Sequence, residues 1–395
     1  MAFRTEISSG EMRCMKNKFI YLDHAATSWP KPREVQEAVR RCMEESGGNP
    51  GRGSHRLASR AAEEIYGCRE TAAAFFDTDP ERVVCTSGAT MGVNLAITGL
   101  LRKGDHVLID SMAHNAVYRP VYHLARLGVI SFTIFDVGES EEDCIRSVVA
   151  LRKSNTRMII ATHMSNICSH IAPISKLGEF CREEGILLVV DGAQSAGHLP
   201  ISIRDCGITA LALPGHKGLL GPQGCGLLLF GEDAPVCTPL VFGGSGTHSL
   251  EPEMPADLPE HLEAGTLPTP AIAGLHAGLK LLGKENLQVR WEKMLCLSSL
   301  FIRESSVIPE LQFYGNTHGN VLSFTMNGFL PSQIAEHLAN AGICVRSGYH
   351  CAPLAHRTIG SFRTGTVRIS FGSGNTAREV FRVLDVLESL RRKTL

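Results

Sequence analysis

The stretch ITALALPGHKG, residues 208–218, leads from an apolar run directly into a turn that holds a lysine between glycines. It contains one of six short apolar runs between about residues 82 and 230, and each run ends at a turn signal: RVVCTSG, HVLID, RMIIATH, GILLVVD, ITALALP and CGLLLF. Amphipathic segments such as 91–101 and 174–185 separate several of them. Strands that are apolar on both faces and alternate with helices are typical of a mainly parallel sheet covered by helices. The sequence therefore predicts an α/β fold.

Polar residues lie where several of these predicted strands end. In an open α/β sheet, ligands bind beyond the carboxyl ends of the strands. We therefore expect a binding site built from the residues at these ends, which are Thr86-Ser87-Gly88, His114, Asn166, Asp191 and Lys217.

The remaining sequence predicts a second, smaller α+β domain. After an acid- and proline-rich stretch, a helical pattern runs from Ala271 to about Leu282. Strand-like segments follow at 321–326 and 366–371, with helical patterns near 331–341 and 376–392. We expect a large domain at 30–275 and a small domain formed by 1–29 and 276–395.

Composition excludes several classes of protein. Of the 395 residues, 44% are apolar and 20% charged, and 39 Lys and Arg nearly cancel 40 Asp and Glu, so nothing favours a nucleic-acid or anionic-membrane partner. The sequence has no apolar run of about 18 residues, so it predicts no membrane span. The N-terminal stretch lacks an apolar signal core, which favours a cytoplasmic location. The 13 cysteines form no CxxC pair, so we expect buried thiols and no metal site.

The segment TSGATMGVN, residues 86–94, predicts a strand, a tight turn and a helix. The first turn of a helix offers unpaired N–H groups and a positive dipole end, which suit a phosphate. The alternative is an ordinary helix cap, for which Ser and Thr are common. This segment alone does not decide between the two.

Asp191 and Lys217 are 26 positions apart, so both can lie at the same edge of the sheet. Each has a simpler interpretation, Asp191 as a turn residue and Lys217 as a solvated lysine. In a pocket, Asp191 could pair with a protonated pyridine nitrogen, and a desolvated Lys217 could form a Schiff base. A phosphate-binding turn, an acid and a lysine in this order on one sheet indicate a pyridoxal 5′-phosphate (PLP) site, with Lys217 as the lysine that binds PLP covalently.

The chain resembles the class V, fold type I PLP enzymes, and among them the cysteine desulfurases and selenocysteine lyases of the Suf type. The resemblance covers nearly the whole chain. It rests on YLDHAATSWPKP (21–32), NPGRGSHRLA (49–58), TSGAT (86–90), MAHNA (112–116), HMSN (163–166), DGAQS (191–195), GHKGLLGPQG (215–224), EAGT (263–266), RSGYHCAPL (346–354) and VRIS (367–370).

This resemblance implies a role for individual residues around PLP. His114 would stack on the pyridine ring and assist proton transfer, Asp191 would pair with the ring nitrogen, and Gln194 would bind the ring oxygen. Asn166 would lie near the ring and the substrate. The phosphate would be held by Ser87, Ala89, Thr90 and His216, with Thr266 reaching in from the partner subunit of a homodimer. The substrate would contact Ala25 and Arg346, and Arg368 would bind its carboxylate with two N–H groups.

Two positions depart from the pattern of this family. Pro214 stands before GHK where the family usually has Ser or Thr, so a phosphate contact is missing or replaced, and weaker PLP retention is one consequence. In SNICSH, Cys168-Ser169-His170 follows Asn166 where glycine is more common. The sequence does not explain these three residues.

Cys351 lies in RSGYHCAP, on a glycine-containing loop beside His350 and five residues from Arg346. Nearby positive charge lowers the pKa of a thiol and makes it more reactive. Burial in the small domain is the simpler interpretation, and it suits Cys344 better. The resemblance makes Cys351 the residue that takes sulfur from L-cysteine as a persulfide and leaves L-alanine. The short loop after it implies a protein that activates the enzyme or accepts the sulfur.

Two alternatives remain at this point. A selenocysteine lyase, or a C–S lyase that acts on cysteine or cystine, would keep the cofactor and change the reaction. A weakly catalytic sulfur-carrier or scaffold protein would keep only the fold, and Pro214 is the one feature that favours it.

Overall fold

The computed structural model describes residues 19–51 and 53–392. Residues 1–18, on which the prediction of a missing signal segment rests, lie outside this range, as do Arg52 of the NPGRGSHRLA motif and residues 393–395. Among the described helices, none combines the length and apolar composition needed to cross a membrane.

The larger of the sheets has seven strands in the order β2-β8-β7-β6-β5-β3-β4. Only β8 runs antiparallel to its neighbours. The strands are β2 (Val83–Thr86), β3 (His106–Asp110), β4 (Ser131–Phe135), β5 (Thr156–Thr162), β6 (Leu187–Asp191), β7 (Ala210–Pro214) and β8 (Gly226–Phe230). The predicted mainly parallel sheet is confirmed. The strand β4 was not predicted, because this edge strand is largely exposed and lacks a long apolar run.

Helices cover both faces of this sheet. Alternate residues of a strand point to opposite faces, and on β3 Leu108 belongs to one buried core while Val107 and Ile109 belong to the other. The first core is completed by α3, α6, α7 and α8, and the second by α4 and α5. The helices around the sheet are α2 (Arg33–Glu45), α3 (Arg56–Phe76), α4 (Ala89–Leu100), α5 (Asn115–Arg126), α6 (Glu141–Leu151), α7 (Ile174–Glu184) and α8 (Thr269–Leu282).

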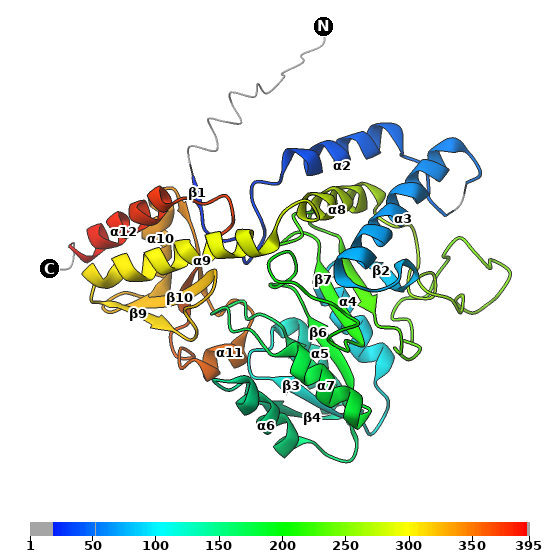
Figure 1. Ribbon diagram of the computed structural model, residues 1–395, viewed down its shortest axis with the longest axis horizontal. Coiled ribbons are helices and arrows are strands. Elements are labelled where there is room, and N and C mark those ends of the chain that lie inside the picture. Colours follow the sequence, from blue (N-terminus) through cyan, green and yellow to red (C-terminus); the bar gives the residue numbers. More distant parts are fainter. Residues whose placement is uncertain (1–18, 52, 393–395) are drawn as a thin grey trace, which may run out of the picture.

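A second, four-stranded sheet is antiparallel throughout, in the order β12-β13-β10-β9. Figure 1 shows this sheet at the left, with helices packed on it, and the larger sheet at the right. Its strands are β9 (Leu311–Tyr314), β10 (Val321–Met326), β12 (Arg346–Gly348) and β13 (Thr366–Ser370), and its helices are α9 (Leu287–Glu304), α10 (Pro331–Asn340) and α12 (Ala377–Arg391). The chain enters this part through β1 (Ile20–Tyr21), which pairs with β11 (Ile343–Cys344), and α11 (Pro353–Thr358) follows the Cys351 loop.

The predicted division of the chain at residues 275 and 276 stays a prediction. The apolar side chains of α8 contribute to the core of the large sheet as far as Leu282. Leu297 and Phe301 of α9 belong to the core of the small sheet, and so does Leu22 near the start of the described chain.

The SNICSH segment joins the two sheets. The Ser169 hydroxyl accepts a 2.9 Å hydrogen bond from the Val321 backbone N–H on β10. A Cβ at Gly319 would lie 2.0 Å from the Ser169 Cβ, and one at Gly315 would lie 2.8 Å from the Cys168 sulfur. Cys168 and Ser169 therefore fill a close contact between the parts of the chain around β5 and β10, which gives these residues a structural role.

Candidate active site

A cavity of about 200 Å³ opens at the edge of the large sheet where the carboxyl ends of its parallel strands meet. The structure brings together in its wall nine of the residues that the sequence placed at the site: Ser87, Ala89, Thr90, His114, Asn166, Asp191, Gln194, His216 and Lys217. Pro214 and Thr162 also line it. Five other predicted residues, Ala25, Thr266, Arg346, Cys351 and Arg368, are not in the cavity wall.

One end of the cavity is formed by the start of α4. Gly88 precedes this helix with a φ of 148°, and a Cβ at Gly226 on β8 would lie 2.5 Å from the Gly88 Cα. Glycine at 226 therefore lets the two backbones approach closely, and glycine at 88 permits this φ at the start of α4, whose first N–H groups are available to a ligand. His216 also lines this cavity, and burial lowers its pKa to about 4, so its ring is neutral at physiological pH.

His114 caps the N-terminus of α5. Its Nδ1 accepts a 3.0 Å hydrogen bond from the Ala116 backbone N–H. Burial, and then the nearby charge of Lys217, lower the pKa of His114 to about 4. The ring is therefore neutral at physiological pH and carries its proton on Nε2.

Asp191 and Lys217 influence each other's ionisation. Burial lowers the pKa of Lys217 to about 8, against the opposing charge of Asp191. Burial raises the pKa of Asp191, while a hydrogen bond from the Ala193 N–H and the charge of Lys217 lower it. The arrangement supplies an amine that is easily deprotonated and a buried carboxylate suited to a cationic partner.

Residues 25–31 form hydrogen bonds with residues of the cavity wall. The Gln194 side chain donates a 2.9 Å hydrogen bond to the Ala25 carbonyl, and Ala25 in turn donates from its N–H to the Ser370 hydroxyl on β13. The carbonyl of His216 accepts hydrogen bonds from the Ser28 N–H and from the Lys31 side chain. The motif YLDHAATSWPKP contains Lys31, but its sequence neighbours do not indicate that it supports the Lys217 turn.

Two arginines from the small sheet lie opposite each other near the cavity. Arg346 on β12 and Arg368 on β13 are direct cross-strand partners, so their side chains lie on the same face. Like charges in this position repel each other, which favours an anion between or beside them. Arg346 is exposed, whereas Arg368 is buried and forms a 2.7 Å ion pair with Asp23. Sequence reasoning did not assign a role to Asp23.

Two hydrogen bonds attach the Cys351 loop, one to the start of α5 and one to the cavity wall. The Asn115 backbone N–H donates to the Cys351 carbonyl over 2.7 Å, and the Asn166 side chain donates to the His350 carbonyl over 2.8 Å. Cys351 is exposed, and among the described cysteines only Cys296 is also exposed. Burial lowers the pKa of His350 to about 2. The expectation that His350 adds positive charge beside the thiol is therefore wrong, because its ring is buried and neutral.

Thr266 lies apart from the cavity of its own chain. It is exposed and accepts a 3.2 Å hydrogen bond from the Asn49 side chain. A role for Thr266 at this kind of site therefore requires a second chain.

Comparison with known proteins places the chain in a family. A model of the family described as aminotransferase class V matches residues 20–383. The chain belongs to the class V aminotransferases. The predicted family resemblance and fold type are confirmed.

Class V relatives that match over nearly the whole chain are named cysteine desulfurases. A probable cysteine desulfurase of Methanothermobacter thermautotrophicus is 32% identical, and the match covers 94% of each chain. One from Pyrococcus abyssi is 31% identical over 95% of each chain. These relatives support a PLP-dependent cysteine desulfurase function for this class V chain.

Solved structures agree with the fold. The apo cysteine desulfurase of Thermococcus onnurineus NA1 superposes with a TM-score of 0.85 at 29% identity, over 95% of this chain and 96% of that one. The cysteine desulfurase CsdA of Escherichia coli, in an S-sulfonic acid form, gives 0.85 at 25% identity over 97% and 98%. A NifS-like protein gives 0.81 at 21% identity, which shows the fold alone.

The class V family is PLP-dependent, and the cavity fits this cofactor. Two of its buried polar atoms have no hydrogen-bond partner within the described ranges: Nδ1 of His216 and Oδ1 of Asn166. An unpartnered buried polar atom is costly, so a polar ligand is expected there. The helix start, the buried Asp191 and the amine of Lys217 match the phosphate, the ring nitrogen and the aldehyde of PLP.

Proposed function

We propose that this class V chain removes sulfur from L-cysteine, with PLP held on Lys217, and carries the sulfur as a persulfide on Cys351. L-Alanine is the other product. The observation that supports this most is the attachment of the exposed Cys351 loop to Asn115 and Asn166, since Asn166 and the neighbouring His114 line the cavity.

The residues that would hold PLP come from five strand ends of the large sheet. Ser87, Ala89, Thr90 and His216 lie where the phosphate would bind, and Gln194 and Asn166 lie in the wall beside the ring. Asp191 would keep the ring nitrogen protonated. PLP, when bound, withdraws electrons from the substrate α-carbon. Lys217 would accept the α-proton of the substrate on its Nζ, for which its lowered pKa suits it.

His114 and the arginines would orient the substrate. The Nε2–H of neutral His114 is the group that can donate to or exchange protons with the reacting atoms, because its Nδ1 is held by Ala116. Arg368 would bind the α-carboxylate from the buried side and Arg346 from the exposed side. Ala25, whose backbone joins Gln194 to Ser370, would lie beside the substrate.

Sulfur transfer itself would take place on the Cys351 sulfur. The thiolate of Cys351 attacks the sulfur of the substrate, and the new S–S bond forms as the substrate Cβ–S bond breaks. The electron pair of the broken bond stays with Cβ, which then takes a proton, and return of a proton from Lys217 to the α-carbon completes alanine. The exposed position of Cys351 leaves the persulfide open to a thiol of an acceptor protein.

The assembly and the location of the protein are part of the same proposal. We infer a homodimer, because Thr266 does not line the PLP cavity of its own chain and would complete the phosphate site of a partner. We also propose a cytoplasmic enzyme that binds neither nucleic acid nor membrane, consistent with its near-zero net charge.

The test combines mass spectrometry with product analysis. After incubation with L-cysteine, Cys351 should carry one additional sulfur atom and alanine should accumulate. The Cys351→Ala variant should lose both, while Cys296→Ala, which removes the other exposed thiol among the described residues, should keep both. Borohydride should fix PLP to Lys217. Pyruvate in place of alanine would indicate a C–S lyase, and absence of bound PLP would indicate a scaffold.

L-Selenocysteine is the alternative substrate. It has the same amino and carboxyl groups as L-cysteine, so Arg368 and Lys217 would bind it equally well. A Cys351→Ala variant that keeps its rate with L-selenocysteine while losing L-cysteine activity would favour a selenocysteine lyase.

A further inference from the structure

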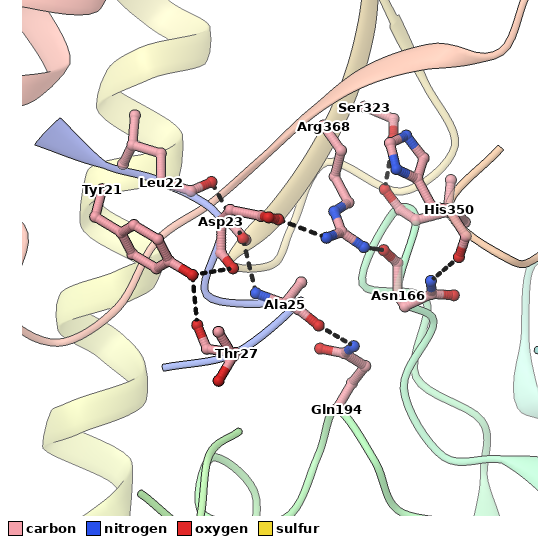
Figure 2. Close-up of polar contacts among 12 residues, drawn as sticks. Tyr21, Leu22, Asp23, Ala25, Thr27, Asn166, Gln194, Ser323, His350 and Arg368 are labelled. Carbon is pink, nitrogen blue, oxygen red and sulfur yellow. Dashed lines mark hydrogen bonds and ion pairs between the residues drawn. The ribbon is translucent and has the colours of Figure 1, made fainter. Parts of the chain in front are cut away.

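Asp23 is held rigidly beside the small sheet. It follows β1 and forms a bridge with Ser370, two residues beyond Arg368 on β13. The Ser370 N–H donates to the Leu22 carbonyl over 2.8 Å, and the Asp23 carbonyl accepts from the N–H of Ala26. The backbone around Asp23 is therefore fixed on both sides, and its carboxylate points at the Arg368 guanidinium (Figure 2).

The Arg368 guanidinium is clamped at its two terminal nitrogens. Nη2 donates to Oδ1 of Asp23 over 2.7 Å, and Nη1 donates to the Asn166 carbonyl over 3.1 Å. These contacts use two of the five N–H donors of the group. Nε is buried and has no partner in the part of the chain that the structure describes. The clamp therefore fixes the plane of the guanidinium and leaves further donors for a ligand.

Asp23 is also the counter-ion of the buried Arg368. Arg368 is only 1% exposed, and Arg346 faces it across the sheet. A buried cation without a counter-ion is strongly unfavourable, and a second cation beside it adds repulsion. Asp23 supplies the one carboxylate that contacts Arg368 in an ion pair among the described residues.

We propose that Asp23 is a positioning residue for the substrate α-carboxylate, acting through Arg368. It fixes the guanidinium plane so that the free N–H donors keep one orientation toward the substrate. This inference rests on the proposed function, because it takes Arg368 as the carboxylate-binding group.

The test compares two ligands with the PLP-loaded enzyme. L-Cysteine carries the carboxylate, and cysteamine has the same amine and thiol without it. In Asp23→Asn the KM for L-cysteine should rise by about tenfold or more while kcat changes little, because a charge-assisted contact is lost. Binding of cysteamine, followed by the visible absorbance of PLP, should stay the same. Asp23→Glu keeps the charge and should give an intermediate KM.

Several controls separate the possible outcomes. Asp385→Asn removes an exposed carboxylate on α12 and should leave both ligands unaffected. If Asp23 only stabilises the fold, thermal stability falls and both ligands weaken equally, which overturns the proposal. An unchanged or lower KM for L-cysteine also overturns it. If Arg368→Ala changes the preference for L-cysteine over cysteamine and Asp23→Asn does not, this inference fails and the proposed function stands. If neither changes it, the carboxylate site itself was assigned wrongly.

Discussion

The backbone N–H of Asn115 and the carbonyl oxygen of Cys351 are joined by a 2.7 Å hydrogen bond. This contact ties the start of α5, which His114 caps, to the loop that carries the exposed thiol. Both His350 and Cys351 have positive φ values, 48° and 59°, and the Ala352 N–H closes the turn onto the Tyr349 carbonyl. Two consecutive residues other than glycine in this region indicate strain that the surrounding contacts overcome.

Replacement of Cys351 should reveal this strain. Both Cys351→Ala and Cys351→Gly remove the thiol and should abolish persulfide formation. Glycine adopts a positive φ without a steric penalty, so Cys351→Gly should be more stable than Cys351→Ala by about 1 kcal/mol. Urea unfolding of the two variants measures the difference. Equal stabilities, or a more stable alanine variant, would contradict a strained turn.

Attachment of PLP to Lys217 should depend on pH. The neutral amine is the reactive form, and burial lowers its pKa from the ordinary 10.5 to about 8. In the cofactor-free protein, the rate of attachment should rise with pH and level off above about pH 8, as measured by borohydride trapping. Nα-Acetyl-L-lysine, whose side-chain amine is free, is the control, and it should continue to gain reactivity as the pH approaches its much higher pKa. If the rate of attachment to the protein rises with pH over the same range as that of the free amine, the lowered pKa of Lys217 is contradicted.

Pro214 should lower the affinity of the site for PLP. It lines the cavity at the end of β7 and offers neither a hydroxyl nor an N–H. Pro214→Ser should slow PLP loss during dialysis roughly threefold to tenfold, the equivalent of about one hydrogen bond. Pro214→Ala restores the N–H without the hydroxyl and should lie between the serine variant and the natural chain. Faster loss from Pro214→Ser would show that the proline ring itself supports the site.

Ser169 should stabilise the contact between the two sheets. In Ser169→Ala the buried Val321 N–H loses its acceptor, which costs about 1–3 kcal/mol of unfolding free energy. The change should appear in denaturant unfolding and leave the affinity for PLP intact. Ser154→Ala, a substitution of an exposed serine before β5, is the matched control. A variant as stable as the natural chain would mean that water or another group satisfies the N–H.

The local sequence predicted the large sheet and much of the cavity. Six apolar runs and the polar residues after them predicted where strands such as β6 and β7 end, because burial on both faces leaves a continuous apolar signature. Asp191 and Lys217 could be placed at one edge because parallel strands share a direction. The edge strand β4 left no such signature, since its first four residues are exposed or only partly buried.

Only the tertiary structure decided how the small sheet completes the site. Asp23 and Arg368 lie 345 positions apart, and nothing near either residue in the sequence indicates their ion pair. The neutral state of His350 likewise depends on burial by elements distant in the chain. Apolar patterns and turn residues act over a few positions, so the sequence determines strands and their ends. Ion pairs and desolvation depend on which distant segments pack together, so these properties exist only in the folded protein.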